Sequence, residues 1–300
     1  MQATGELTVR TQERGGGMRS KVYFRGRRPP SAPTMLVLVH GYANSESRAR
    51  KSYEALVSGL KRSWPDGRLP EVWYFYWPGD TRWPVISQAS FPLQIRRAKH
   101  AGLLLATFLY ERRGNDSSPE VILLAHSLGC RVVLEAIKLL DEWATANRPR
   151  RTHVASTCLM AAAVPVSLCR DGQEFGSRRE DRHEVVLWST WDLVLTCLFP
   201  PGEAAGLDGI CLRSVGSSGQ PELRWKTPRR PSTGLGHSDY YGDRRAADEV
   251  AGQLLRWRVP RALPYQELAE RPILHPENSL EGRELASRPP GSPAPTWLPA

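Results

Sequence analysis

The sequence contains little cysteine, little lysine and no long apolar run. Its five cysteines form no C-x-x-C pair, so neither a disulfide framework nor a zinc site is predicted, and we expect small core residues in a reducing compartment. Every apolar run is far shorter than the roughly 20 residues of a membrane-spanning helix. Residues 1–6 do not resemble a signal peptide, so the sequence favours a soluble, cytoplasmic protein. The cysteines are Cys130, Cys158, Cys169, Cys197 and Cys211.

Basic residues are plentiful but almost all are arginine. Only six of the 41 are lysine, so the net charge of +10 comes mainly from arginine. Such a balance is compatible with nucleic-acid binding, with an anionic membrane surface, or with an ordinary solvated surface. The arginines stand singly or in pairs, such as 27–28 and 96–97, and form no dense block. We therefore favour the solvated surface and expect neither nucleic acid nor a membrane as a partner.

Apolar strand-like and helix-like segments alternate through most of the chain. With 300 residues and 40% apolar content, the chain can form one large α/β domain or two ordinary ones. The alternating order predicts a mostly parallel central sheet with right-handed crossovers and helices on both faces. The predicted strands are residues 35–40, 71–77, 120–125, 154–164, 184–190 and 209–215, and the predicted helices are residues 45–63, 93–113, 128–147 and 246–255.

The two ends of the chain differ in composition from the part between them. Residues 1–33 are polar and arginine-rich, and alternation in two short segments there, 6–11 and 21–25, predicts a β-hairpin at the sheet edge. Residues 259–300 contain nine prolines, which predicts a disordered tail. We expect the α/β domain to span residues 34–258, with residues 169–182 as a surface loop.

Around Ser127 a buried strand gives way abruptly to a helix. The apolar run 121–125 ends at His126-Ser127-Leu128-Gly129, and apolar residues then return at helical spacing over 132–140. Only about two residues remain to turn the chain, so Ser127 must lie on a sharp bend at the N-terminus of a helix. This is the arrangement of a nucleophile elbow. The alternative is an ordinary serine in a strand–turn–helix connection.

A second loop follows the strand 35–40. It reads His40-Gly41-Tyr42-Ala43-Asn44, directly after a continuous apolar run. Because parallel strands end at one edge of the sheet, this loop and the Ser127 bend are expected at the same edge. The alternative is a tight turn at a strand end that takes no part in chemistry.

These two segments resemble the α/β-hydrolase superfamily. Together with residues 75–79, 189–192 and 236–240, the Ser127 segment resembles a bacterial esterase/lipase-like branch of it. The superfamily pattern is G-x-S-x-G, and this chain departs from it at Ala125. The resemblance covers about residues 34–258. It implies that Ser127 is the nucleophile, that the N–H groups of Tyr42 and Leu128 form an oxyanion hole, and that His40 is structural. It implies no metal and no organic cofactor.

A serine nucleophile needs a histidine as base and an acid that orients the histidine. The superfamily order is serine, acid, histidine, which matches Ser127, then Asp192 after the strand 184–190, then His237 in a glycine-flanked loop. His126 adjoins the nucleophile and is expected to point elsewhere, and Asp239 is expected to cap a helix. Remaining candidates for the base are His40, His100, His153, His183 and His275, and for the acid Asp171 and Asp208.

The resemblance implies a serine hydrolase that cleaves a small-molecule carboxylic ester or thioester through an acyl-enzyme. The missing first glycine and the basic termini motivate an alternative, a catalytically inactive hydrolase-fold protein used for binding. Residues 78–92 and 200–233 are expected to shape the acyl pocket, and the aromatic segment 73–91 either lines that pocket or belongs to the core. The acyl and alcohol parts of the substrate and the oligomeric state are not predicted.

Overall fold

The computed structural model describes most of the chain up to residue 256. None of the helices in the described ranges combines the length and the apolar character that crossing a bilayer requires. The predicted disordered tail and most of the predicted pocket loops lie outside the described residues and stay predictions. The described residues are 4–13, 16–26, 32–64, 67–80, 91–112, 120–146, 152–177, 179, 181–200, 213–218 and 232–256.

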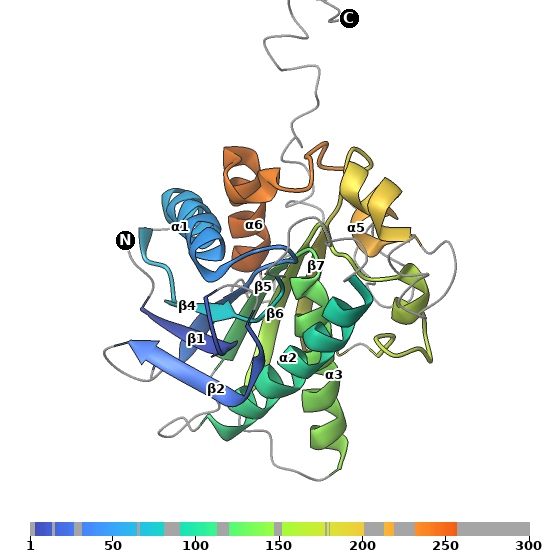
Figure 1. Ribbon diagram of the computed structural model, residues 1–300. Coiled ribbons are helices and arrows are strands. Elements are labelled where there is room, and N and C mark those ends of the chain that lie inside the picture. The colour runs from blue at the N-terminus through green and yellow to red at the C-terminus, as the bar shows by residue number, and fades with distance from the viewer. Residues whose placement is uncertain are drawn as a thin grey trace, which may run out of the picture. The chain divides into compact units, whose positions relative to one another are not determined.

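Within these residues, seven strands form one sheet in the order β2-β1-β4-β3-β5-β6-β7 (Figure 1). Neighbouring strands are parallel except β2 and β1, which pair antiparallel at one edge. The central strands are nearly continuous apolar runs because both faces of a parallel sheet are covered. The strands are β1 (Gly5–Arg10), β2 (Met18–Gly26), β3 (Thr34–Val39), β4 (Glu71–Tyr76), β5 (Glu120–His126), β6 (His153–Met160) and β7 (His183–Leu187).

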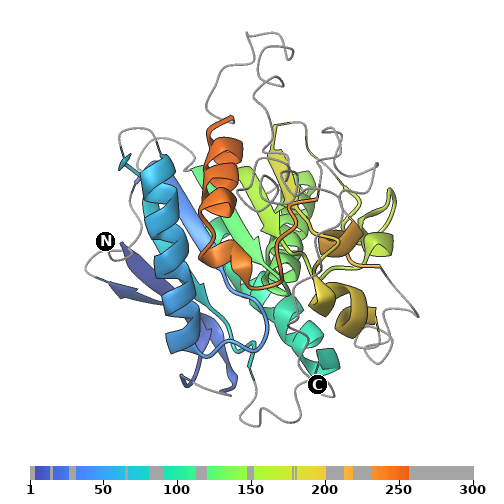
Figure 2. The same ribbon diagram turned by 90° about the horizontal axis from the view of Figure 1, so that it is seen from above.

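Two pairs of helices enclose the sheet. Figures 1 and 2 show α1 (Glu46–Ser63) and α6 (Arg244–Arg256) on one face, with α2 (Phe91–Glu111) and α3 (Gly129–Thr145) on the other. Each helix that follows a strand returns the chain to the amino end of the next parallel strand. The predicted architecture is therefore confirmed: this is a mostly parallel α/β sheet with helices on both faces.

The N-terminal segments 6–11 and 21–25 lie in β1 and β2, which pair antiparallel. β2 is the edge strand, and its side chains are largely exposed. β1 lies between β2 and β4, where Leu7 and Val9 are fully buried. The first strands of the chain are thus continuous with the sheet that residues 34–256 complete.

The strand predicted at residues 209–215 is wrong in its described part. Residues 213–218 form no sheet strand: Ser214 makes an isolated bridge to Pro165, and Val215–Ser218 is the short helix α5. The N–H groups of Val215 and Gly216 donate to carbonyls just beyond β6, so the segment crosses the end of that strand instead of pairing along it. The surface loop predicted at residues 169–182 is confirmed in its described part, since residues 170–173, 177 and 181 are exposed. The buried side chains within it are those of Cys169, Phe175 and Arg182.

The core contains aromatic residues and arginines that the sequence left open as pocket wall or solvated surface. The aromatic residues of 73–77 are all fully buried, so in its described part this segment is core and not pocket wall. Four of the described arginines are buried, as exceptions to the predicted solvated basic surface. A buried guanidinium requires paired acceptors, so each marks a site of tertiary bonding. They are Arg10, Arg112, Arg131 and Arg182.

Candidate active site

Ser127 follows β5 directly and is held in the left-handed region of backbone space, with φ of +53°. A non-glycine residue adopts this strained conformation only where its surroundings fix it. The Ser127 N–H donates to the Met160 carbonyl at 2.9 Å, and the Ser127 carbonyl accepts from Ala163 at 3.2 Å. The bend is therefore anchored to the end of β6, and α3 begins two residues later.

Two glycines allow the Ser127 bend and the loop after β3 to touch. A Cβ at Gly129 would lie 2.4 Å from the His40 carbonyl oxygen, and a Cβ at Gly41 would lie 2.7 Å from the Ser127 Cβ. Any larger residue at either position would force the two segments apart. Ala125, where the superfamily has glycine, is fully buried in β5 in register with its neighbouring strands.

The structure brings Ser127, His237 and Asp192 into one hydrogen-bonded chain. The His237 Nε2 lies 2.9 Å from the Ser127 Oγ, and the His237 Nδ1 lies 2.8 Å from the Asp192 Oδ2. The second Asp192 oxygen accepts from the Leu195 N–H at 3.0 Å. Asp192 is fully buried, whereas the His237 side chain keeps 16% of its surface exposed. When the His237 Nδ1–H donates to the Asp192 carboxylate, the Nε2 lone pair is left to accept from the serine hydroxyl.

Two backbone segments flank the serine hydroxyl. Leu128 precedes the first turn of α3, and no described residue accepts a hydrogen bond from its N–H. The N-terminus of a 17-residue helix carries partial positive charge, which favours an anion beside it. Tyr42 lies in the loop whose Gly41 packs against Ser127. This arrangement offers two candidate N–H donors next to a candidate nucleophile.

His40 is buried behind this loop, and each of its ring nitrogens makes a hydrogen bond. Its Nδ1–H donates to the Gly41 carbonyl at 2.8 Å, and its Nε2 accepts from the Trp77 N–H at 3.3 Å. The ring also stacks on Trp77, with centroids 5.6 Å apart. Burial lowers the pKa of His40 to about 3, so the imidazole stays neutral at physiological pH. His40 therefore supports the loop and has no free nitrogen to act as a base.

His126 does not point away from the site, which corrects that expectation. Its Nε2–H donates to the carbonyl of His237 at 2.6 Å, and the two imidazole rings lie 4.9 Å apart. Burial, with a smaller contribution from His237, lowers the pKa of His126 to about 3. His126 is therefore a neutral donor that holds the loop carrying His237. The direction of this side chain depends on where the 233–238 loop returns, which no local pattern reports.

The other described candidates do not bond to Ser127. His100 is exposed on α2, His153 lies 3.6 Å from Asp181, and Asp171 is exposed. His183 is the first residue of β7, so it lies at the amino ends of the parallel strands, whereas Ser127 follows the carboxyl end of β5. His275 and Asp208 lie outside the described residues.

The prediction that Asp239 caps the following helix is wrong for α6. Asp239 instead stabilises the turn that carries His237. Its Oδ2 accepts from the N–H of Gly236, the residue before His237, at 2.8 Å. The helix α6 is capped instead by Asp243, whose Oδ1 accepts from the Ala246 N–H at 3.0 Å. The turn between the two acids is a short 3-10 helix, Asp239–Tyr241, which delays the start of α6.

The described residues include side chains of the types that bind metal ions, among them four cysteines. In the part of the chain that the structure describes, no group of three histidine, cysteine, aspartate or glutamate side chains is placed to hold a metal ion. Cys130, Cys158 and Cys169 are buried, and Cys197 is exposed. Cys211 lies outside the described residues.

We expect the free energy of unfolding to fall as the pH drops from 7 to 5. His40 and His126 have folded-state pKa values of about 3 against an ordinary 6.5, so the unfolded chain binds protons that the folded chain excludes. The stability they contribute is present above pH 6.5 and is lost toward pH 3, by about 2 kcal/mol for each histidine at pH 5. Urea unfolding at both pH values measures the loss. His126→Gln, which keeps a donor but cannot titrate, is expected to reduce it, and an unchanged pH dependence in that variant would contradict this account.

In comparisons with known proteins, no family model and no curated protein matches this sequence. Among solved structures, the chain is similar to Aspergillus fumigatus lipase B, with 16% sequence identity and a TM-score of 0.30. The match covers 53% of this chain and 38% of the lipase chain. The chain thus spans well under half the length of that lipase.

Proposed function

We propose that this protein is a serine hydrolase that cleaves a carboxylic ester or thioester through an acyl-enzyme. The observation that carries the proposal is the hydrogen-bonded chain from Ser127 through His237 to a fully buried Asp192. A serine, a base within bonding distance and an acid that orients the base are the parts that nucleophilic acyl transfer requires. The strained backbone at Ser127 adds support, because such strain concentrates at functional sites.

In the first half of the proposed reaction, the Ser127 Oγ attacks the carbonyl carbon of the ester while the His237 Nε2 takes the hydroxyl proton. The carbonyl oxygen becomes an oxyanion, which the N–H groups of Leu128 and Tyr42 stabilise. Asp192 balances the charge of the imidazolium without taking its proton. When the tetrahedral intermediate collapses, His237 gives the proton to the departing alcohol or thiol, and the acyl group stays on Ser127.

In the second half, a water molecule takes the place of the alcohol. His237 removes a proton from the water as it attacks the acyl carbon, and the same donors hold the second oxyanion. Collapse returns the proton to the Ser127 oxygen and releases the carboxylic acid. The exposed fraction of the His237 side chain leaves a route for water and substrate to the imidazole.

A panel of p-nitrophenyl esters from acetyl to palmitoyl, with matched acyl thioesters, tests this proposal. We expect the wild-type protein to hydrolyse at least one of them with saturable kinetics, and the chain-length optimum to report the depth of the acyl site. A folded protein that hydrolyses none of these compounds would instead support the catalytically inactive binding protein.

A further inference from the structure

Arg10 is the last residue of β1, and its side chain is fully buried. It carries a permanent charge into the interior at the edge of the sheet where Ser127 lies, since β1 runs parallel to the strands beside it. Burying a charge is costly unless it is paired and hydrogen-bonded throughout. The site must therefore supply acceptors for a planar guanidinium with five N–H donors.

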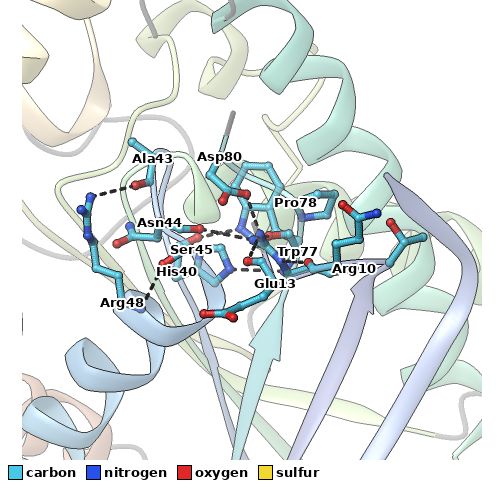
Figure 3. A network of polar contacts seen from close by, with 12 residues as sticks. Arg10, Glu13, His40, Ala43, Asn44, Ser45, Arg48, Trp77, Pro78 and Asp80 are labelled. Atoms are coloured by element: carbon cyan, nitrogen blue, oxygen red, sulfur yellow. Dashed lines mark hydrogen bonds and ion pairs between the residues drawn. The ribbon is translucent and has the colours of Figure 1, made fainter. Parts of the chain in front are cut away.

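The acceptors come from three separate loops at this edge (Figure 3). From the turn after β1, the Gln12 carbonyl accepts from Nε at 3.1 Å and the Glu13 carbonyl from Nη2 at 2.5 Å. From the loop after β3, the Asn44 carbonyl accepts from Nη1 at 3.3 Å. From the segment after β4, the Trp77 carbonyl accepts from Nη1 at 2.9 Å.

Among the described residues, the charged partner of Arg10 is Asp80, whose Oδ1 lies 2.6 Å from the Arg10 Nη2. Its side chain is 6% exposed, so the ion pair is shielded from solvent and salt. Figure 3 shows Asp80, Trp77 and Asn44 gathered around the Arg10 guanidinium. The charged pair makes Arg10 the common bonding partner of all three loops.

The loop that Arg10 holds in this way is the one that contains Tyr42. The Ala43 N–H donates to the Gly79 carbonyl at 2.7 Å, so the loop is bonded to the segment after β4 one residue beyond Tyr42. Ala43 itself has φ of +59°, a strained conformation that outside bonds must maintain. Gly41, on the other side of Tyr42, packs against Ser127 with no room for a side chain. A shift of this loop therefore moves Tyr42 relative to the serine.

We propose that Arg10, through its ion pair with Asp80, is a positioning residue that sets the place of the Tyr42 N–H over Ser127. This inference rests on the proposed function, because it assigns Arg10 an effect on the oxyanion and not on substrate binding. An oxyanion donor stabilises the transition state more than the bound ester, so a displaced donor lowers kcat and leaves KM nearly unchanged. Lysine cannot replace Arg10, because a single ammonium cannot reach three loops at once.

The test compares Arg10→Lys with Arg182→Lys. Arg182 is also buried and paired, with Asp141 at 2.9 Å and Glu184 at 3.2 Å. Arg182 lies just before β7, at the amino ends of the parallel strands, whereas Ser127 lies at their carboxyl ends. Its substitution therefore controls for the loss of a buried ion pair alone. The readouts are kcat and KM for the best ester, and hydrogen exchange of the Ala43 amide, measured well below both melting temperatures.

For Arg10→Lys we expect kcat to fall by about tenfold to a hundredfold with KM within about twofold, since losing an oxyanion donor outright costs about 10²–10³. Exchange at Ala43 should accelerate by about tenfold or more, because the bond to Gly79 opens once the loop is released. Arg182→Lys should change neither. Equal falls in kcat for both variants, or an unchanged kcat and Ala43 exchange in Arg10→Lys, would overturn the inference.

Asp80→Asn serves as a second variant if Arg10→Lys does not fold, because it removes the charge of the pair and leaves the arginine in place. The same two readouts apply, with the same direction expected. The two proposals fail in different ways. A wild-type protein that hydrolyses no ester refutes the proposed function, and Ala43 exchange then decides whether Arg10 fixes the loop. An active wild type with an unaffected Arg10→Lys variant refutes only the role of Arg10.

Discussion

Replacing Ser127 with alanine is expected to reduce ester hydrolysis to the background rate while leaving the protein folded. The hydroxyl is the only group on the described hydrogen-bonded chain that can form an ester with the acyl group. Removing the nucleophile of a complete serine–histidine–acid chain typically costs about 10⁶ in kcat. The measurement is kcat for the best ester of the panel, with circular dichroism and the melting temperature as checks on folding.

The matched control for this variant is Ser156→Ala. Ser156 is a fully buried serine in β6 whose hydroxyl has no partner among the described residues, so its removal changes no polar contact. We expect that variant to keep wild-type activity. If Ser127→Ala retained a substantial part of the wild-type rate, the nucleophile would have to be another residue.

Asp192→Asn is the second large effect that we expect, with kcat lowered by about 10⁴. The substitution keeps the size of the side chain, and the amide oxygen can still accept from the Leu195 N–H. The amide nitrogen then faces the His237 Nδ1, which must become an acceptor. The imidazole proton moves to Nε2, so the ring donates toward Ser127 and cannot take the serine proton.

Asp171→Asn is the control for this prediction, since Asp171 was the main rival acid by sequence and is exposed. It should retain wild-type kcat. Full activity in Asp192→Asn together with a large loss in Asp171→Asn would transfer the role of the acid.

The part of the site that the sequence predicts most directly is encoded by one contiguous segment of the chain. The bend at Ser127 follows from an apolar strand, about two residues of turn and an amphipathic helix, all within residues 121–140. Asp192 and His237 were found by resemblance to a superfamily order and by their places after a strand and before a helix. Their hydrogen bonds to each other depend on the tertiary fold, which brings together loops 45 residues apart in the sequence.

The parts that could not be predicted depend on strand order and on loop return. Arg10 meets the loops after β3 and β4 only because β1 inserts beside β4, and no pattern within residues 5–10 reports that neighbour. The same limit applies to His126, whose bond to the His237 carbonyl joins residues 111 positions apart. Local periodicity likewise favoured a strand at 209–215, where tertiary bonds to the end of β6 hold residues 214–218 in a bridge and a short helix.

The most direct test of the central claim is mass spectrometry of the wild-type protein after reaction with an activated fluorophosphonate. This reagent phosphonylates a serine that a neighbouring imidazole activates, and it needs no knowledge of the natural substrate. We expect a single added phosphonyl group in the tryptic peptide 114–131, on Ser127. A folded protein that stays unmodified, or that carries the group on a different residue, would contradict it.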